Sequence, residues 1–392
     1  MTSEWHEVPL RELVGFISKG IAPSYAEEAS ETTIRVLNQK CNRNFRISYG
    51  DSRLHDTMKK KVSPERYVKP DDILINSTGA GTAGRIAQIE DVPSATTIDG
   101  HMILIRSNGK VTQKFLGYAL KAHQWEVLQL DEGSTGQTEL NRDRLLDEIM
   151  INYPVSFDEQ NAIVGTLESI DRKLIVNEQL NDNLQQQATA LFSSLYDRSN
   201  TEVRFTDLIQ ILGGGTPKTG ESTYWNGNIA FFTPKDVGTP YTLITEKTIS
   251  EEGLSHCNSR LYPVNTVFVT ARGTVGKVGI SGVPMAMNQS CYALVGKETH
   301  QLLVYFYTLK AVDRLKHKAS GAVFDAITTR DFESEQIMKL SDDDAKAFLC
   351  IAEPMFQKVL NNCIENLRLS TLRDSLLPKL MSGEIDVSAI QL

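Results

Sequence analysis

Two long segments of this 392-residue chain share one spacing of apolar side chains, and this repeat constrains the fold more than any other feature. Placing Ile163 over Phe348 brings the two runs into register. The spacing alternates between four and three residues over more than about four heptads, which is typical of a coiled coil. Each segment is predicted to form a helix of about 40 residues, roughly 60 Å long. The first seam is Ile163, Leu167, Ile170, Leu174, Asn177, Asn181, Leu184, Ala188, Leu191 and Leu195, and the second is Phe348, Ala352, Met355, Val359, Asn362, Asn366, Leu369, Arg373, Leu376 and Leu380.

Paired asparagines stand at matching positions in the two seams. Helices duplicated about a two-fold axis run antiparallel, which sets Asn177 against Asn366 and Asn181 against Asn362. Amides paired inside an apolar seam fix its register, because a slip would bury them without partners. The alternative is that the helices splay at this point and leave the amides in solvent.

Two residues of the second segment depart from the pattern. Arg373 interrupts the apolar seam. Pro354 is expected to kink or break the helix near its start, at a cost of about 3 kcal/mol. The symmetry between the two copies should therefore be approximate.

The regions that precede the two helices also correspond. Each has an extended run followed by a glycine-rich loop (69 to 90 and 263 to 281), a strand (101 to 106 and 291 to 296) and an amphipathic helix (114 to 130 and about 300 to 318). The predicted fold is α+β, with two mixed, strand-rich domains separated by two long helices that form an antiparallel coiled coil, in a pseudo-two-fold internal repeat. The predicted boundaries are 1–155 for the first domain, 156–198 for the first long helix, 199–340 for the second domain and 341–392 for the second helix and tail.

The net charge of -8 is unevenly distributed along the chain. Most of the acidity falls in the two helical segments, and the two large domains are close to neutral. Residues 35 to 69 carry ten basic side chains against three acidic ones. This stretch, with Arg43, Lys59, Lys60 and Lys61, could face phosphate groups, although a solvated charged face is the competing interpretation.

The first glycine-rich loop, Gly79 to Gly84, has the G-x-G-x-x-G form of a dinucleotide site. Its context is wrong for that function, because an alternating, strand-like stretch follows where a helix is needed. The second loop aligns Gly81 and Gly84 with Gly273 and Gly276 but sets Arg272 over Ala80. Both loops are therefore predicted to be tight hairpins. Candidate phosphate contacts on them are Arg85, Arg272 and Lys277.

The run GGGTPKT at 213 to 219 resembles a phosphate-binding loop but lacks the Gly-Lys-Ser/Thr ending of a P-loop. Its Thr216 and Lys218, and Lys235 shortly after, suit contacts with a nucleic-acid backbone as well as an ordinary turn. The nearby Trp225 is predicted to be a core residue, with a stacking platform as the alternative.

Catalytic and metal-binding patterns are missing from the sequence. No prolines are adjacent, so the Asn/Asp-Pro-Pro-Tyr/Phe tetrapeptide of amino-methyltransferases is absent, as are His-x-x-x-His and Gly-x-Ser-x-Gly. The five cysteines form no CxxC pair. We expect no cofactor, no metal and no catalytic residue. The sequence also has no apolar segment long enough for a membrane span and no signal core, and we expect a cytoplasmic protein.

Several stretches resemble the specificity (S) subunits of Type I restriction-modification systems, the HsdS family, and the resemblance covers nearly the whole chain. The most characteristic are SKGIAPSY (18 to 25), YPVSFDEQNAIV (153 to 164), GGGTPKTGESTYWNGNIAFFTPKDV (213 to 237) and LRDSLLPKLMSGEID (372 to 386). The second helix departs from the family, since DDDAKAFL stands where the first helix has its Pro-x-x-x-x-Glu-Gln pattern.

The resemblance implies that the two domains are target-recognition domains, each reading half of a split DNA site. It also implies that two methyltransferase (M) subunits dock on the helices and that motor-nuclease (R) subunits join them. The candidate DNA contacts are Lys19, Arg43, Lys59, Lys60, Lys61, Arg85, Thr216, Lys218, Lys235, Arg272 and Lys277. Two rival interpretations remain: a coiled-coil scaffold whose domains bind proteins, and a nucleotide-dependent enzyme built on the glycine loops.

Overall fold

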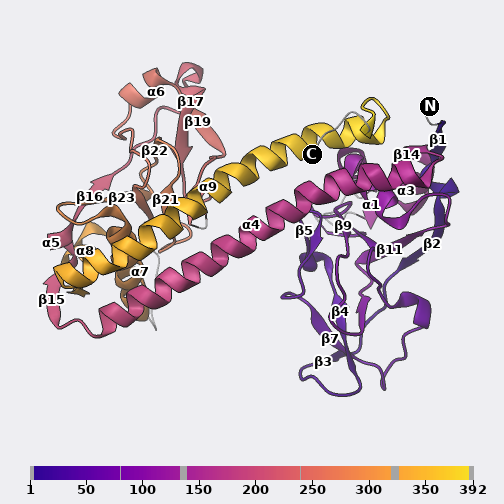
Figure 1. Ribbon diagram of the computed structural model, residues 1–392, viewed down its shortest axis with the longest axis horizontal. Helices are drawn as coiled ribbons and strands as arrows, with labels where there is room; N and C mark the ends of the chain where they lie inside the picture. Colours follow the sequence, from indigo (N-terminus) through magenta and orange to yellow (C-terminus); the bar gives the residue numbers. More distant parts are fainter. Residues whose placement is uncertain (1–3, 80, 133–138, 239, 319–325, 388–392) are drawn as a thin grey trace. The chain divides into compact units, whose positions relative to one another are not determined.

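The computed structural model describes residues 4–79, 81–132, 139–238, 240–318 and 326–387 (Figure 1). The chain divides into two compact units. Unit 1 is Met1–Lys173 with Leu369–Leu392, and unit 2 is Leu174–Arg368. Each unit contains one strand-rich domain and part of each long helix. Because this division cuts both helices, the four-segment boundaries drawn from the sequence stay a prediction.

The two long helices are α4, Phe157–Asp197, and α9, Asp342–Met381. Within unit 2, Asn177 contacts Asn366 and Phe192 contacts Phe348, so numbers rise along α4 as they fall along α9. The halves of the helices are therefore antiparallel there. In unit 1 the helices share one apolar cluster with the same pairing, from Ile163, Val164 and Leu167 to Leu376, Leu377, Leu380 and Met381.

Helix α9 passes through Pro354 without interruption, so the expected break is wrong. Proline removes one N–H donor and leaves the carbonyl four residues earlier, at Cys350, without its helical partner. Pro354 and Cys350 are both exposed, so water can reach that carbonyl. The packed apolar residues on the opposite side of α9, Phe348 and Ala352, hold the helix in place.

The domain of unit 1 contains two four-stranded sheets. The first has the order β2-β11-β8-β9 and the second the order β10-β4-β7-β3. The strands of the first are β2 (Val14–Lys19), β11 (Met102–Ser107), β8 (Ile73–Asn76) and β9 (Ile86–Gln88), and those of the second are β10 (Thr96–Ile98), β4 (Thr33–Leu37), β7 (Arg53–Asp56) and β3 (Tyr25–Ala26). Smaller pairs are β1 (Trp5–Pro9) with β14 (Met150–Pro154), β5 (Asn42–Arg43) with β6 (Arg46–Ile47), and β12 (Asp131–Glu132) with β13 (Glu139–Leu140). The short helices are α1 (Gln113–Ala122), α2 (Gln124–Val127) and α3 (Arg142–Glu148). The single helix expected over 114 to 130 is thus divided at His123.

The domain of unit 2 repeats this arrangement of two sheets, but its first sheet has one strand more and its second sheet one strand fewer. Its sheets have the orders β16-β23-β20-β21-β18 and β19-β17-β22. The strands of the first are β16 (Ile209–Gly213), β23 (Cys291–Gly296), β20 (Val267–Thr270), β21 (Val278–Ser281) and β18 (Tyr241–Thr242), and those of the second are β19 (Lys247–Ile249), β17 (Trp225–Phe232) and β22 (Met285–Met287). A further pair is β15 (Thr201–Arg204) with β24 (Gln336–Lys339), and the helices are α5 (Phe205–Leu208), α6 (Glu251–Ser255), α7 (Gln301–Lys318) and α8 (Thr329–Ser334). The parallel pair β10–β4 recurs as β22–β17, which confirms the duplication at the level of strand direction.

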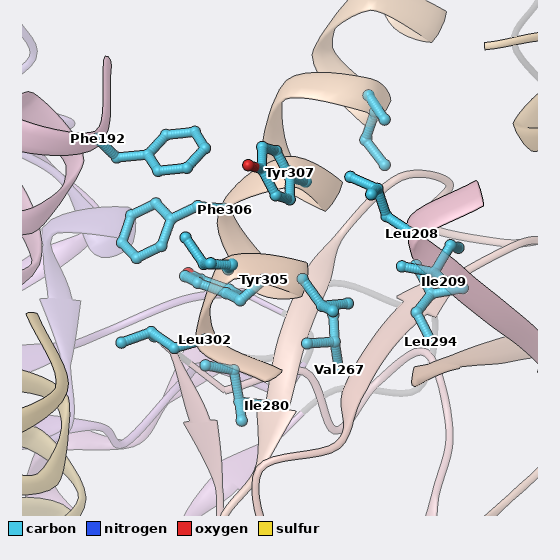
Figure 2. Packing of buried hydrophobic residues seen from close by; sticks show 14 of the residues in the cluster. Phe192, Leu208, Ile209, Val267, Ile280, Leu294, Leu302, Tyr305, Phe306 and Tyr307 are labelled. Atoms are coloured by element: carbon cyan, nitrogen blue, oxygen red, sulfur yellow. The ribbon is translucent and has the colours of Figure 1, made fainter. Parts of the chain in front are cut away.

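Aromatic rings hold the unit 2 domain to its half of the long helices (Figure 2). Phe192 of α4 stacks on Phe306 of α7 with ring centroids 5.0 Å apart, and Phe348 of α9 meets both rings edge-on. Phe356 of α9 extends the contact to Phe306 and Tyr305. Offset and edge-to-face ring pairs of this kind add about 0.5–1.5 kcal/mol each beyond the area they bury.

Charged side chains occupy the corresponding joint in unit 1. Asp171 of α4 accepts hydrogen bonds from Arg373 Nη1 of α9 at 3.0 Å, from Lys121 Nζ at 3.1 Å and from Tyr118 Oη at 2.9 Å. The Arg373 side chain is only 16% exposed, so it lies within the helix interface. The charge that interrupts the apolar seam there is paired with Asp171. Offset by the same repeat distance, Asp171 corresponds to Phe356.

Within the described ranges, no helix combines enough residues with enough apolar character to span a membrane.

Candidate nucleic-acid interface

Both glycine-rich loops are antiparallel hairpins. The first joins β8 to β9 and the second joins β20 to β21. Gly81 and Gly84 have φ of 68° and 82°, and their partners Gly273 and Gly276 have φ of 82° and 73°, a region that favours glycine. A strand follows each loop, which excludes the helix that a dinucleotide site requires.

The hairpins match at their ends but differ in length. Asn76 N donates to Arg85 O at 2.9 Å, and Thr270 N donates to Lys277 O at 3.0 Å. The first loop is therefore longer by two residues between its closing pair. Thr78 forms an isolated bridge with Glu139, and Arg272 forms the equivalent bridge with Ala326. Arg272 thus corresponds to Thr78. The alignment that set it over residue 80 is wrong, and residue 80 itself lies outside the described residues.

A second glycine position recurs in both domains. A Cβ atom added at Gly20 would lie 2.1 Å from the carbonyl oxygen of Asp99, and one at Gly214 would lie 2.2 Å from that of Asn288. Nothing larger than glycine fits so close to a backbone. The stretches beginning SKG and GGG are therefore the same element in the two copies, an equivalence that the sequence repeat did not reveal.

In each domain, the hairpin and the glycine element both contact one short segment. In unit 1 this segment is 99–101, and Ser77 N at the start of the hairpin donates to His101 O at 2.8 Å. In unit 2 it is 288–290, where Ala271 N donates to Ser290 O at 2.8 Å. We call the hairpin, the glycine element and this segment together the loop cluster of each domain.

Lys19 in the unit 1 cluster already has an anionic partner. Its ammonium group forms an ion pair with Glu139. Burial raises the pKa of Asp99, which lies beneath this loop, although its carboxylate accepts a hydrogen bond from His101 N at 2.9 Å. The positive potential offered by Lys19 is correspondingly reduced.

Lys59, Lys60 and Lys61 lie on a turn beside the same glycine element. Lys60 Nζ donates to Ala22 O at 2.9 Å, and the buried His55 accepts from Ser24 N at 2.9 Å. Lys59 has a distant carboxylate at Asp56, 4.0 Å away. Lys61 is exposed.

The basic stretch from 35 to 69 offers fewer accessible charges than its composition suggests. Arg35 is half-buried and donates to Ser52 Oγ at 3.0 Å, and Arg53 lies 4.3 Å over the Tyr25 ring. Arg43 is exposed on β5. Arg85 folds back on its hairpin, with Nη2 donating to Gly81 O at 3.0 Å.

The unit 2 cluster gathers most of its predicted residues. Thr216 Oγ1 donates to Gln289 Oε1, and Thr274 of the hairpin donates to Pro234 O at 3.3 Å, which brings the Lys235 turn alongside. Lys235 lies 3.6 Å from Glu246. The remaining predicted contacts, Lys218, Arg272 and Lys277, are exposed.

Trp225 packs as a core residue at the edge of this domain. Its ring meets Phe231 edge-on at 5.5 Å, and Nε1 donates to Lys218 O at 3.2 Å. The ring is partly buried between these contacts. It therefore supports the glycine element instead of standing free as a stacking platform.

The same two segments that carry the duplicated domains match one family model. Residues 2–186 and 198–339 each match the model for the Type I restriction modification DNA specificity domain. The chain belongs to this family. Two specificity domains in succession account for the repeated sheets and for the paired loop clusters.

Curated members of the specificity family resemble parts of the chain. The MjaIX specificity subunit of Methanocaldococcus jannaschii is 31% identical over 31% of this chain and 29% of its own length. The HindI specificity subunit of Haemophilus influenzae is 28% identical over 46% of this chain and 40% of its own length. The matched region therefore spans less than half of either relative.

A solved structure supports the fold over a longer range. The Type I restriction-modification S subunit from M. genitalium is similar to this chain with a TM-score of 0.62, at 15% sequence identity, over 97% of this chain and 96% of that one. At this identity the likeness concerns the fold alone.

In the described parts of this specificity-family chain, no group of three or more His, Cys, Asp or Glu side chains is placed to hold a metal ion. The side chains that the clusters do present are cations, amides, hydroxyls and an imidazole, which are groups that bind phosphates and base edges.

Proposed function

We propose that the chain is the sequence-specific DNA-binding subunit of a Type I restriction-modification complex, itself without catalytic residues. Each strand-rich domain reads one half of a bipartite site. Membership of the specificity family supports this proposal, as do relatives named as specificity subunits.

The recurring loop cluster is the observation that carries the proposal. In both domains, glycine at a position that excludes Cβ lets one loop lie against the carbonyls of a second segment, and a hairpin closes on the same segment. Exposed cations stand on or beside these loops, with Lys277 on the unit 2 hairpin and Lys61 on the turn beside the unit 1 glycine element. Closely packed loops with cationic and amide side chains can set the register on phosphates and read bases.

The electrostatics favour modest, specific binding over strong general binding. The two domains are near neutral, and several predicted cations have carboxylate partners, such as Lys19 with Glu139 and Lys235 with Glu246. Few phosphate contacts imply a shallow dependence of affinity on salt. Discrimination then has to come from base contacts.

The long helices are proposed to dock two methyltransferase subunits, with motor-nuclease subunits joining the complex. Exposed apolar side chains on the helices suit protein contact. They include Val176 and Leu180, one turn apart on α4, and Leu367 on α9. Such side chains stay in water in the free subunit, and a partner would cover them.

Mapping of methylated bases tests the proposal. The chain is co-expressed with its cognate methyltransferase, and methylated adenines are located by sequencing genomic DNA. Because the two domains differ in their exposed side chains, we expect one gapped motif made of two different words. A continuous motif, or no motif, would contradict the proposal.

The alternative function is a coiled-coil scaffold whose two domains bind proteins. The modest charge of the domains is the observation that favours it. Gel shifts with duplex DNA at several salt concentrations separate the two functions, since a scaffold would show no salt-dependent binding.

A further inference from the structure

The segments at the centre of the two loop clusters share one backbone design. Asp99 Oδ1 accepts a hydrogen bond from His101 N at 2.9 Å, and Asn288 Oδ1 accepts one from Ser290 N at 3.0 Å. The first residue of each segment therefore has the same structural task. The next two residues differ completely between the copies, Gly100 and His101 against Gln289 and Ser290.

His101 is the exposed side chain of this segment in unit 1. Its Nδ1 shares a hydrogen bond with Thr78 Oγ1 at 2.7 Å, which holds the ring against the hairpin. Among the described residues, none forms a hydrogen bond with Nε2. A ring fixed through one nitrogen keeps the other available for a base edge.

Gln289 is the exposed side chain of the equivalent segment in unit 2, one position before Ser290, the counterpart of His101. Its Oε1 accepts the hydroxyl hydrogen of Thr216. No described residue takes the two hydrogens on its Nε2. Arg272 is held beside it, because its backbone N donates to Ser290 O at 3.3 Å. Glutamine pairs with adenine and arginine with guanine in the major groove.

The support under these side chains is closely packed and common to both domains. Gly20 and Gly214 pack within van der Waals range of the segment's carbonyls, and the hairpins bond to its far end. Lysines elsewhere on the loops can set affinity through phosphates but carry no sequence information. A fixed backbone that presents a different side chain in each copy is what a specificity determinant requires.

We propose that His101 and Gln289 are the base-reading side chains of the two loop clusters, and that their difference makes the two half-sites different. The inference rests on the proposed function and deepens it. Thr78 and Thr216 are positioning residues, because they act by holding His101 and Gln289.

The test uses the full chain co-expressed with its cognate methyltransferase. Methylation motifs and affinities for the wild-type site are measured for the unaltered chain and for His101→Ala, Gln289→Ala and Gln336→Ala. The last is a matched control, since Gln336 is an exposed residue of β24 that lies outside the loop clusters and outside the long helices. We expect Gln289→Ala to accept other bases at one position of one half-site, with affinity lowered about tenfold. His101→Ala should do the same in the other half-site, and Gln336→Ala should change nothing.

A charge variant removes the risk that truncation disturbs the loop. Gln289→Glu keeps the side-chain length and the acceptor for Thr216, but its carboxylate accepts from cytosine N4. We expect it to shift the preferred base at the same position towards cytosine.

The outcomes separate the inference from the function on which it rests. If His101→Ala and Gln289→Ala keep every position of the wild-type motif, or if both relax the same half-site, the inference is wrong and the proposed function stands. If the unaltered chain gives no gapped motif, the proposed function fails and the inference fails with it.

Discussion

Asn362 of α9 donates from Nδ2 to Asn181 Oδ1 of α4 at 2.8 Å, inside unit 2. Four residues along α9, Asn366 Oδ1 accepts from Asn177 Nδ2 at 2.8 Å. These are the two contacts predicted from the sequence for seams that run antiparallel. Asn362 is fully buried, and its own Oδ1 has no partner among the described residues. The amides lie within the interface, so the alternative of solvent-exposed asparagines on splayed helices is wrong.

The buried amide pair predicts that Asn181→Leu destabilises the protein more than its size change suggests. The substitution removes Asn181 Oδ1, so both Nδ2 and Oδ1 of the buried Asn362 are left without a hydrogen bond. We expect this to lower the free energy of unfolding by about 1–3 kcal/mol. Replacing both residues by leucine should recover most of that loss, because no polar group is left unpaired. Denaturant unfolding of the two single variants and the double variant measures this. A double variant as unstable as the sum of its parents would contradict the pairing.

The carboxylate of Asp171 predicts an acid-sensitive joint in unit 1. Burial alone would raise the pKa of Asp171, but the charges of Lys121 and Arg373 and the hydrogen bonds around it hold that pKa below its usual value. A carboxyl with a depressed folded pKa stabilises the fold above its unfolded pKa of about 4 and loses that contribution as the pH falls further. Asp171→Asn should therefore cost about 3–5 kcal/mol near pH 7. The cost should shrink below pH of about 4.

Hydrogen exchange across pH provides the check on that joint. Peptides from α1, which carries Tyr118 and Lys121, should lose protection in acid earlier than peptides from α7, which packs through Phe306. Equal acid sensitivity of α1 and α7 would rule out the assigned role of Asp171. Phe356→Leu is a control, because it alters the corresponding position of unit 2 without adding a charge.

The long helices and the hairpins could be predicted from sequence because their signals are local. The seam spacing and the positive-φ glycines lie within a few turns of chain, and the Asn177–Asn366 contact followed from the repeat. The equivalence of Gly20 with Gly214 could not be predicted, since it depends on carbonyls more than 70 residues away and on sequences that share little besides one glycine. Gln289 could not be singled out from the sequence for the same reason. Its segment is identified by the close approach of Gly214 to the backbone of Asn288.

The hairpin glycines predict unequal effects of the same substitution. A Cβ at Gly84 would lie 2.9 Å from Val127 O, whereas one at Gly81 would meet nothing within 4 Å. Both residues have positive φ, which costs about 1 kcal/mol for alanine. Gly81→Ala should show only this cost, and Gly84→Ala should lose a further 1–3 kcal/mol or so through the clash. Thermal unfolding of the two variants, read by a probe in β9, distinguishes them. Equal losses would show that α2 does not pack against this loop.

Lys277 predicts a measurable phosphate contact in unit 2. It is exposed on the closing turn of the hairpin, and no carboxylate of a described residue forms an ion pair with it. Removing one phosphate contact reduces the slope of log affinity against log salt by about 1. Lys277→Ala should therefore weaken binding to specific and random duplexes alike and flatten the slope. Lys235→Ala should have a smaller effect, because Glu246 lies 3.6 Å from that ammonium group. Lys379→Ala, on α9 beside Glu384, is the matched control and should leave the slope unchanged. An unchanged slope for Lys277→Ala would place the second hairpin away from the DNA backbone.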